Sequence, residues 1–216
     1  SNVKLVNTIE NLAGNTVLSC TAHTDSEELK KQRDFGNMSL MLYKSGKKTK
    51  GDAGVTIDSG LLFPENKQAQ AEATHGEQLC GVLSKTVKLK PGESKGITFI
   101  IGWYFPNLIL PQNKNSKGEN KGRFYSKRFA NSKEVAEDIA KKYDDLYEKT
   151  IAWRNCFYND STLPHWFLNR TFANTSILAT ETCYLLEDGR FWAWEGIGCC
   201  AGTCTHVWHY AQALGR

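Results

Sequence analysis

The hydrophobic pattern of this chain changes once, after Phe105-Pro106, and that change limits the fold more than any other feature. Before it, short runs rich in β-branched and aromatic residues alternate with clusters of Gly, Asn and Ser, which is typical of antiparallel strands. After it, apolar residues recur every three or four positions, which indicates helices. The sequence therefore predicts strands first and helices second, and the predicted strands span residues 3–9, 16–24, 38–43, 54–57 and 97–104.

A hairpin is the most clearly marked unit in the first part of the chain. Residues 82–89 alternate between apolar and polar side chains, and Lys90-Pro91-Gly92-Glu93 follows as a turn, because Pro presets φ and Gly accepts a positive φ. The return strand, residues 97–104, is nearly continuous in Ile, Phe and Trp, so we expect it to be buried on both faces. These features predict an antiparallel β-sandwich over residues 1–122, with a polar linker at about 107–122.

Helical periodicity dominates the second part, residues 123–216. Asn131 can cap a first helical turn, and Glu134, three residues later, can close a capping box. Apolar side chains then follow at gaps of three and four as far as Phe157, which predicts one long amphipathic helix. A second helix is predicted over residues 165–182, with Pro164 in its first turn.

The end of the chain combines a predicted turn, strand and helix. Residues 187–190 form a tight polar turn in this interpretation, and residues 191–194 form a short buried strand. A third helix is expected over residues 205–216. Because that helix has no following partner in the chain, we expect the polypeptide to be truncated.

Charge and composition exclude several classes of protein. The net charge is +4, and Lys gathers in loops at residues 44–50 and 113–127. The second loop is rich in Gly and Asn and has no aromatic platform before Phe124, so we expect a solvated loop and no nucleic-acid partner. No apolar run reaches the length that crosses a bilayer, so no transmembrane segment is expected. The odd count of seven Cys does not assign a redox compartment.

Residues 194–210 carry most of the side chains that could perform chemistry. A zinc site is one interpretation, but adjacent cysteines rarely share one tetrahedral ion and no Cys-x-x-Cys pair is present. Nucleophilic catalysis by Cys204 is another, but a His two residues away points elsewhere on a helix and no orienting carboxylate is near. We therefore expect no metal and no cofactor, and interpret the cysteines as small buried residues. The possible zinc ligands weighed here are Cys199, Cys200, Cys204, His206 and His209.

A carbohydrate site is the third interpretation of residues 194–210. Flat aromatic faces and hydrogen-bonding groups match a sugar ring, which has an apolar face and a polar edge. Aromatic residues at helical spacing belong to a core more often than to a sugar platform. Glycoside hydrolysis normally needs two carboxyl groups, and Glu195 is the only acidic residue here whose setting suggests a pocket.

The same tail resembles the start of the catalytic region of glycoside hydrolase family 116, the family of bile-acid β-glucosidase. The residues that carry the resemblance are Glu195-Gly196, Gly202-Thr203-Cys204-Thr205-His206-Val207-Trp208 and Tyr210-Ala211-Gln212-Ala213-Leu214. Upstream support comes from residues 89–93 and 99–106, which are similar to the last hairpin of that family's N-terminal domain. Residues 125–129 and Leu163-Pro164-His165-Trp166 resemble its linker and first barrel helix.

The resemblance implies a β-sandwich over residues 1–122, followed over residues 123–216 by the first helices of an (α/α)6 catalytic barrel. It implies a retaining β-glucosidase whose catalytic carboxylates follow Arg216, so no residue here is assigned a catalytic role. The expected partners are a carbohydrate or glycoside substrate and the remainder of the catalytic domain. The alternative is a non-catalytic carbohydrate-binding or scaffold protein. The predicted substrate-binding residues are Trp194, Glu195, His206, Trp208 and His209.

Overall fold

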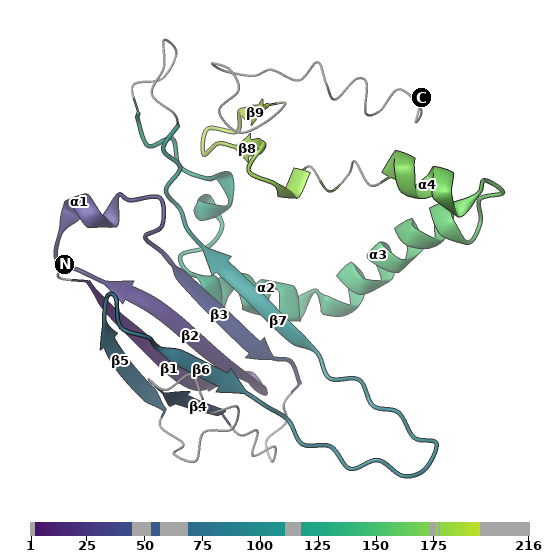
Figure 1. Cartoon of the computed structure of the whole chain (residues 1–216), viewed down its shortest axis with the longest axis horizontal. Coiled ribbons are helices and arrows are strands. Elements are labelled where there is room, and N and C mark those ends of the chain that lie inside the picture. The colour runs from purple at the N-terminus through teal and green to yellow at the C-terminus, as the bar shows by residue number, and fades with distance from the viewer. Residues whose placement is uncertain are drawn as a thin grey trace. The chain divides into compact units, whose positions relative to one another are not determined.

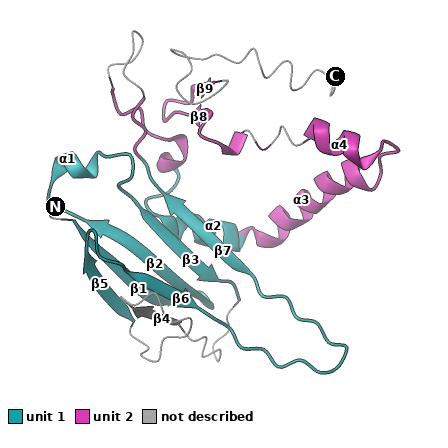
Figure 2. Ribbon diagram, in the orientation of Figure 1, with its two compact units in different colours: residues 1–106, 128–141 teal, residues 107–127, 142–216 magenta. Residues whose placement is uncertain are grey.

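The structure, a computed structural model, describes residues 3–44, 53–56, 69–110, 118–172, 176 and 178–194. The chain divides into two compact units, which Figure 2 distinguishes by colour. Unit 1 contains residues 1–106 and 128–141, and unit 2 contains residues 107–127 and 142–216.

Unit 1 is built on an antiparallel sheet of five strands with the order β5-β1-β2-β3-β7 (Figure 1). A two-residue loop, Ala13-Gly14, joins the first two strands, and both residues have positive φ (+50° and +83°), as a tight hairpin turn requires. The strands predicted near residues 3–9, 16–24, 38–43 and 97–104 are confirmed. The strands are β1 (Lys4–Leu12), β2 (Asn15–His23), β3 (Asn37–Leu42), β5 (Gln70–Thr74) and β7 (Phe99–Tyr104).

A smaller ribbon of two strands, β4 (Ala53–Thr56) and β6 (Cys80–Leu83), packs against one face of this sheet. Leu83 joins Leu18 and Leu42 in a buried apolar cluster. Gly81 allows this close approach, because a Cβ atom at that position would meet the side chain of Leu18 at 2.5 Å.

The predicted hairpin is wrong, although its turn is present. Glu93 N–H donates to the Lys90 carbonyl at 3.0 Å, and Gly92 has φ +78°. The flanking strands do not pair with each other, since β6 pairs with β4 and β7 pairs with β3. Residues 84–98 include five charged side chains and too few apolar ones to cover a sheet face, so strand pairing stops on both sides of the turn.

Strand β7 is buried on one face only, which corrects the prediction that both faces are covered. Ile100 is 6% exposed, whereas Ile101 and Trp103 are about 60% exposed (59% and 61%). The reason is that β7 lies at the edge of the sheet, beside β3. A helix packs against the face of β7 opposite to Ile101 and Trp103.

Helix α2 (Ser132–Lys141) covers that opposite face through Ala136, which packs with Val17, Met41 and Ile100. The helix approaches β7 closely at Gly102, where a Cβ atom would collide with the Ser132 carbonyl oxygen. The Ser132 side chain also bonds to Ser39 at 2.7 Å in a buried setting. The absence of a side chain at Gly102 and the hydrogen bond between Ser132 and Ser39 therefore fix the helix on the sheet.

The predicted capping of α2 is confirmed. Asn131 Oδ1 accepts the Glu134 N–H at 3.0 Å, and the Glu134 carboxylate accepts the Ala130 N–H at 2.7 Å. The prediction of one long helix is wrong, because α2 ends at Lys141 and α3 (Tyr143–Tyr158) follows after a break at Lys142. The two halves of the apolar stripe have different partners: α2 packs on β7 and β3, and α3 packs on α4.

In unit 2, α3 and α4 (His165–Phe172) meet through aromatic side chains. The ring centroids of Phe157 and Phe172 are 3.7 Å apart, and those of Trp153 and Phe157 are 4.9 Å apart. The prediction that this helix continues to residue 182 is wrong, because residues 180–182 form a bend and turn. The Thr180 and Thr182 hydroxyls bond to each other at 2.6 Å, a local side-chain bond that competes with helix formation.

The structure also contains two short helices that the sequence did not predict. Helix α1 (Glu27–Lys30) is capped by the Ser26 hydroxyl, which accepts the Leu29 N–H at 3.3 Å. A 3-10 helix, η1, spans Phe124–Lys127. Within the described ranges, no helix combines the length and apolar character that crossing a bilayer requires.

The contact at Gly102 gives a test of the fold. We expect Gly102→Ala to lower the free energy of unfolding of the chain by about 1–3 kcal/mol, because the new methyl group forces α2 away from β7. Gly96→Ala is the matched control, since a Cβ atom there meets nothing within 4 Å. Urea unfolding measures both changes, and equal effects of the two substitutions would contradict this packing.

Candidate functional site

The described part of the candidate site is a two-stranded ribbon that ends at Trp194. Its strands are β8 (Cys183–Leu185) and β9 (Phe191–Ala193). The turn between them is tight, with Gly189 at φ +88° and its N–H donating to the Leu186 carbonyl at 2.9 Å. The predicted polar turn and short strand are therefore confirmed, although Phe191 is half exposed.

The carboxylate of Asp188 holds this turn closed. It accepts the Arg190 backbone N–H at 3.0 Å and the Arg190 Nε–H at 2.7 Å. The backbone hydrogen bond first, and the guanidinium second, hold the pKa of the Asp188 carboxyl below its ordinary value. Asp188 is a structural residue of the turn, because both of its described partners lie within the turn itself.

Trp194 is a core residue of unit 2, with 3% of its surface exposed. Its indole ring meets Tyr184 edge-on with a centroid distance of 5.0 Å, and Trp192 at 5.8 Å. Its backbone N–H donates to the Thr182 carbonyl at 2.9 Å. Trp194 therefore anchors the chain immediately before Glu195. The surrounding buried cluster contains Leu108, Leu110, Tyr184, Leu186 and Trp194.

Glu181, Tyr184 and Arg123 form a polar network beside this cluster. The Tyr184 hydroxyl donates to Glu181 at 2.9 Å, and the Arg123 guanidinium lies 3.6 Å from the same carboxylate. Arg123 also lies over the Tyr184 ring, 5.8 Å from its centroid. Glu181 lies in a turn and not in the predicted helix. Because its side chain is half exposed, its ion pair with Arg123 contributes little to stability by itself.

Two backbone segments, residues 107–110 and 118–123, hold the ribbon in place. Asn120 Oδ1 accepts the Leu108 N–H at 2.8 Å and the Gly122 N–H at 3.1 Å. Gly122, at φ +63°, accepts the Glu187 N–H through its carbonyl at 3.2 Å. Residues 107–122 were predicted to be a polar linker, so the structural role of Asn120 was missed. Its only signal was its position in an Asn-rich stretch, and many exposed loops share that feature.

The other predicted substrate-binding residues lie outside the described residues: Glu195, His206, Trp208 and His209. The cysteines weighed as zinc ligands or as a nucleophile, Cys199, Cys200 and Cys204, lie outside them as well. Within the described ranges, no group of three or more His, Cys, Asp and Glu side chains is placed to hold a metal ion.

The described thiol nearest to this region is a poor nucleophile. Burial raises the pKa of Cys183, and a hydrogen bond with the Thr182 hydroxyl only partly opposes that effect. A raised pKa leaves less thiolate near neutral pH, and the thiolate is the reactive form. The described part of the site therefore offers aromatic packing and backbone positioning.

Comparison with known families identifies the chain. The family model described as "beta-glucosidase 2, glycosyl-hydrolase family 116 N-term" matches residues 35–146, more than half of the 216 residues. The matched range runs from β3 through β7 and α2 into α3. The chain belongs to glycoside hydrolase family 116, which confirms the resemblance inferred from the sequence. The match begins before residues 89–93, the earliest that carried the resemblance, and ends before residues 195–214, which carried most of it.

The buried position of Trp194 gives a test of its anchoring role. We expect Trp194→Ala to lower the free energy of unfolding by about 3–5 kcal/mol, because it leaves a large cavity among Tyr184, Trp192 and Leu186. Trp166→Ala is the matched control, since Trp166 is 72% exposed and its loss should cost less than about 0.5 kcal/mol. Chemical denaturation measures both. A small effect of Trp194→Ala, similar to that of the control, would contradict the packing described here.

Proposed function

We propose that this chain is part of a retaining β-glycosidase that hydrolyses β-glucosides. The single observation that carries the proposal is the match of residues 35–146 to the N-terminal domain of glycoside hydrolase family 116. The tail motif, from Glu195-Gly196 to Leu214, adds support because it resembles the start of the catalytic region in the same family.

In this proposal, the sheet-containing part belongs to an N-terminal β-sandwich over residues 1–122. Residues 123–216 form the first helices of an (α/α)6 barrel. The five-stranded antiparallel sheet and the smaller ribbon on its face support the first assignment. The helical pair α3–α4 supports the second. The remainder of the catalytic domain and a glycoside substrate are the proposed partners.

The ribbon β8–β9 has a defined task in this proposal. Its buried Trp194 and its bonds to residues 118–123 fix the backbone up to the residue before Glu195. A pocket residue is useful only when the backbone that carries it is held rigidly. Glu195, His206, Trp208 and His209 are the proposed substrate-binding residues, and Trp194 is proposed to belong to the same site by holding the backbone that precedes Glu195.

The direct test is hydrolysis. The full-length protein that contains this chain should release the aryl alcohol from an aryl β-glucoside, with the aryl α-glucoside as the control substrate. Turnover of the β-anomer alone is the expected result, because a retaining β-glycosidase attacks from the face opposite the leaving group. Absence of turnover on the β-glucoside would favour the carbohydrate-binding or scaffold alternative.

Glu195→Gln tests the role of the one acidic residue in the tail motif. If Glu195 binds substrate through hydrogen bonds, KM should rise about tenfold while kcat stays within a few-fold, since the interaction acts on substrate and transition state alike. Glu187→Gln, in the exposed turn, is the matched control and should change neither parameter. A loss of kcat by about a thousandfold or more would contradict the binding role and make Glu195 one of the two catalytic carboxylates.

A further inference from the structure

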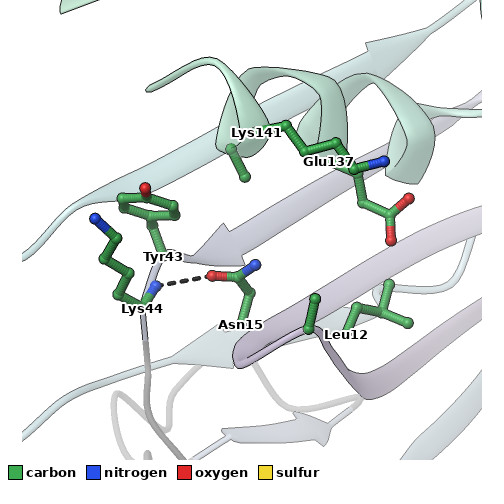
Figure 3. A pocket seen from close by; sticks show the side chains of 8 residues that line it. Leu12, Asn15, Tyr43, Lys44, Glu137 and Lys141 are labelled. Atoms are coloured by element: carbon green, nitrogen blue, oxygen red, sulfur yellow. Dashed lines mark hydrogen bonds between the residues drawn. The ribbon is translucent and has the colours of Figure 1, made fainter. Parts of the chain in front are cut away.

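A pocket of about 250 Å³ lies at one end of the sheet in unit 1. Its walls come from the β1–β2 turn, the end of β3 and the last turns of α2 (Figure 3). The polar residues that line it are Asn15, Lys44, Glu137 and Lys141.

Asn15 supplies a fixed hydrogen-bond donor to this pocket. Its side chain is more than nine-tenths buried (8% exposed), and its Oδ1 accepts the Lys44 backbone N–H at 2.8 Å. That bond sets the orientation of the amide group. In Figure 3 the amide nitrogen points away from Lys44 and into the space below α2. Within the described part of the chain no acceptor pairs with this nitrogen, which remains accessible to solvent and can therefore donate to a ligand in the pocket.

Glu137 and Lys141 supply charged groups from the opposite wall. They lie one helical turn apart on α2 and therefore on the same face of the helix. Neither side chain makes a hydrogen bond or an ion pair with another described residue. The pocket thus combines a carboxylate acceptor, an ammonium donor and the Asn15 amide donor.

The rest of the lining is apolar and belongs to the core. Leu12, Ala140 and the ring of Tyr43 pack against the buried cluster beneath α2. The Lys44 ammonium group lies 4.8 Å from the centre of the Tyr43 ring, which places a further positive charge at the rim. The floor of the pocket is therefore packed and apolar, and the polar groups of Asn15, Glu137 and Lys141 lie at its edges.

We propose that this pocket on unit 1 binds one monosaccharide unit of a carbohydrate. A pyranose ring has a C–H face for the apolar floor, and its hydroxyl groups both donate and accept, so a single ligand can satisfy Glu137, Lys141 and Asn15 together. An inorganic anion would meet the Glu137 carboxylate, and a purely apolar ligand would leave the Asn15 donor unpaired. The volume is close to the lower end of small-molecule pockets, about 300 Å³, which suits one ring.

The site can be tested without any assay of turnover. The complete chain, labelled with ¹⁵N, is titrated with the methyl β-glycosides of glucose, galactose, mannose and xylose while its amide resonances are recorded. At least one sugar should cause saturable shifts of the amides of residues 12–15, 43–44 and 137–141, with a Kd of about 1–10 mM. If none of the four shifts these amides at up to about 100 mM, the proposal fails. Because the readout is local to unit 1, that failure leaves the proposed hydrolase function standing.

Two nearly isosteric variants identify the groups responsible. Asn15→Asp keeps the acceptor for the Lys44 N–H but removes the amide donor, and Glu137→Gln removes the charge but keeps the shape. Each should weaken binding about tenfold, whereas Glu148→Gln on α3, an exposed carboxylate outside the pocket, should leave Kd unchanged. The amide spectrum of each variant reports whether its fold is intact.

Two results would overturn the assignment. Wild-type affinity in both folded pocket variants would show that the sugar binds elsewhere. Shifts of the same amides by glycine, in the absence of shifts by any sugar, would make the pocket a site for a zwitterion, with Glu137 and Lys141 taking the two charges.

Discussion

The close approach of helix α2 to strand β7 is the contact on which the sheet-containing unit depends. It is possible because Gly102 has no side chain and leaves room for the Ser132 carbonyl. The buried bond between the Ser132 and Ser39 hydroxyls, and the bond from the Ser132 N–H to Asn37 at 2.6 Å, then fix the helix in one register. Buried polar groups that are satisfied in this way favour one arrangement, because any shift would leave them unpaired.

That register also places the functional groups of unit 1. With Ala136 in the core, Glu137 and Lys141 of α2 lie beside the β1–β2 turn, where they line the pocket. In unit 2, the buried Trp194 ring and the bonds between the ribbon and residues 118–123 hold the backbone that precedes Glu195. In both units a packed aromatic or apolar residue therefore sets the position of neighbouring polar side chains.

The sequence predicted four of the five strands of the sheet, the capping of α2 and the turn at Asp188 because each has a local cause. Strand β5 was not predicted. Alternation, an Asn131–Glu134 box and an Asp-Gly pair act within a few residues. It failed where the cause is distant. Residues 82–104 carried a hairpin pattern, but β3 and β4 competed successfully for the two strands. The helix stripe from Val135 to Phe157 was continuous, yet its halves pack on different partners.

The candidate site shows the same division between local features, which the sequence predicted, and tertiary contacts, which it did not. Trp194 was selected from its place in an aromatic segment, and its burial by Tyr184 and Trp192 depends on tertiary packing that periodicity does not contain. The Arg123–Glu181–Tyr184 network joins residues about sixty positions apart, so no local pattern marks it. Asn15, Glu137 and Lys141 also escaped attention, since an Asn after a turn and a Glu–Lys pair on a helix are common on protein surfaces.

The membership in glycoside hydrolase family 116 connects these observations to carbohydrate chemistry. The central claim is that the protein containing this chain hydrolyses β-glucosides with retention. The most direct measurement is proton NMR of an aryl β-glucoside during the first minutes of hydrolysis, before the released sugar mutarotates. The account predicts that the β-anomer of glucose appears first, and first appearance of the α-anomer, or no release of glucose at all, would contradict it.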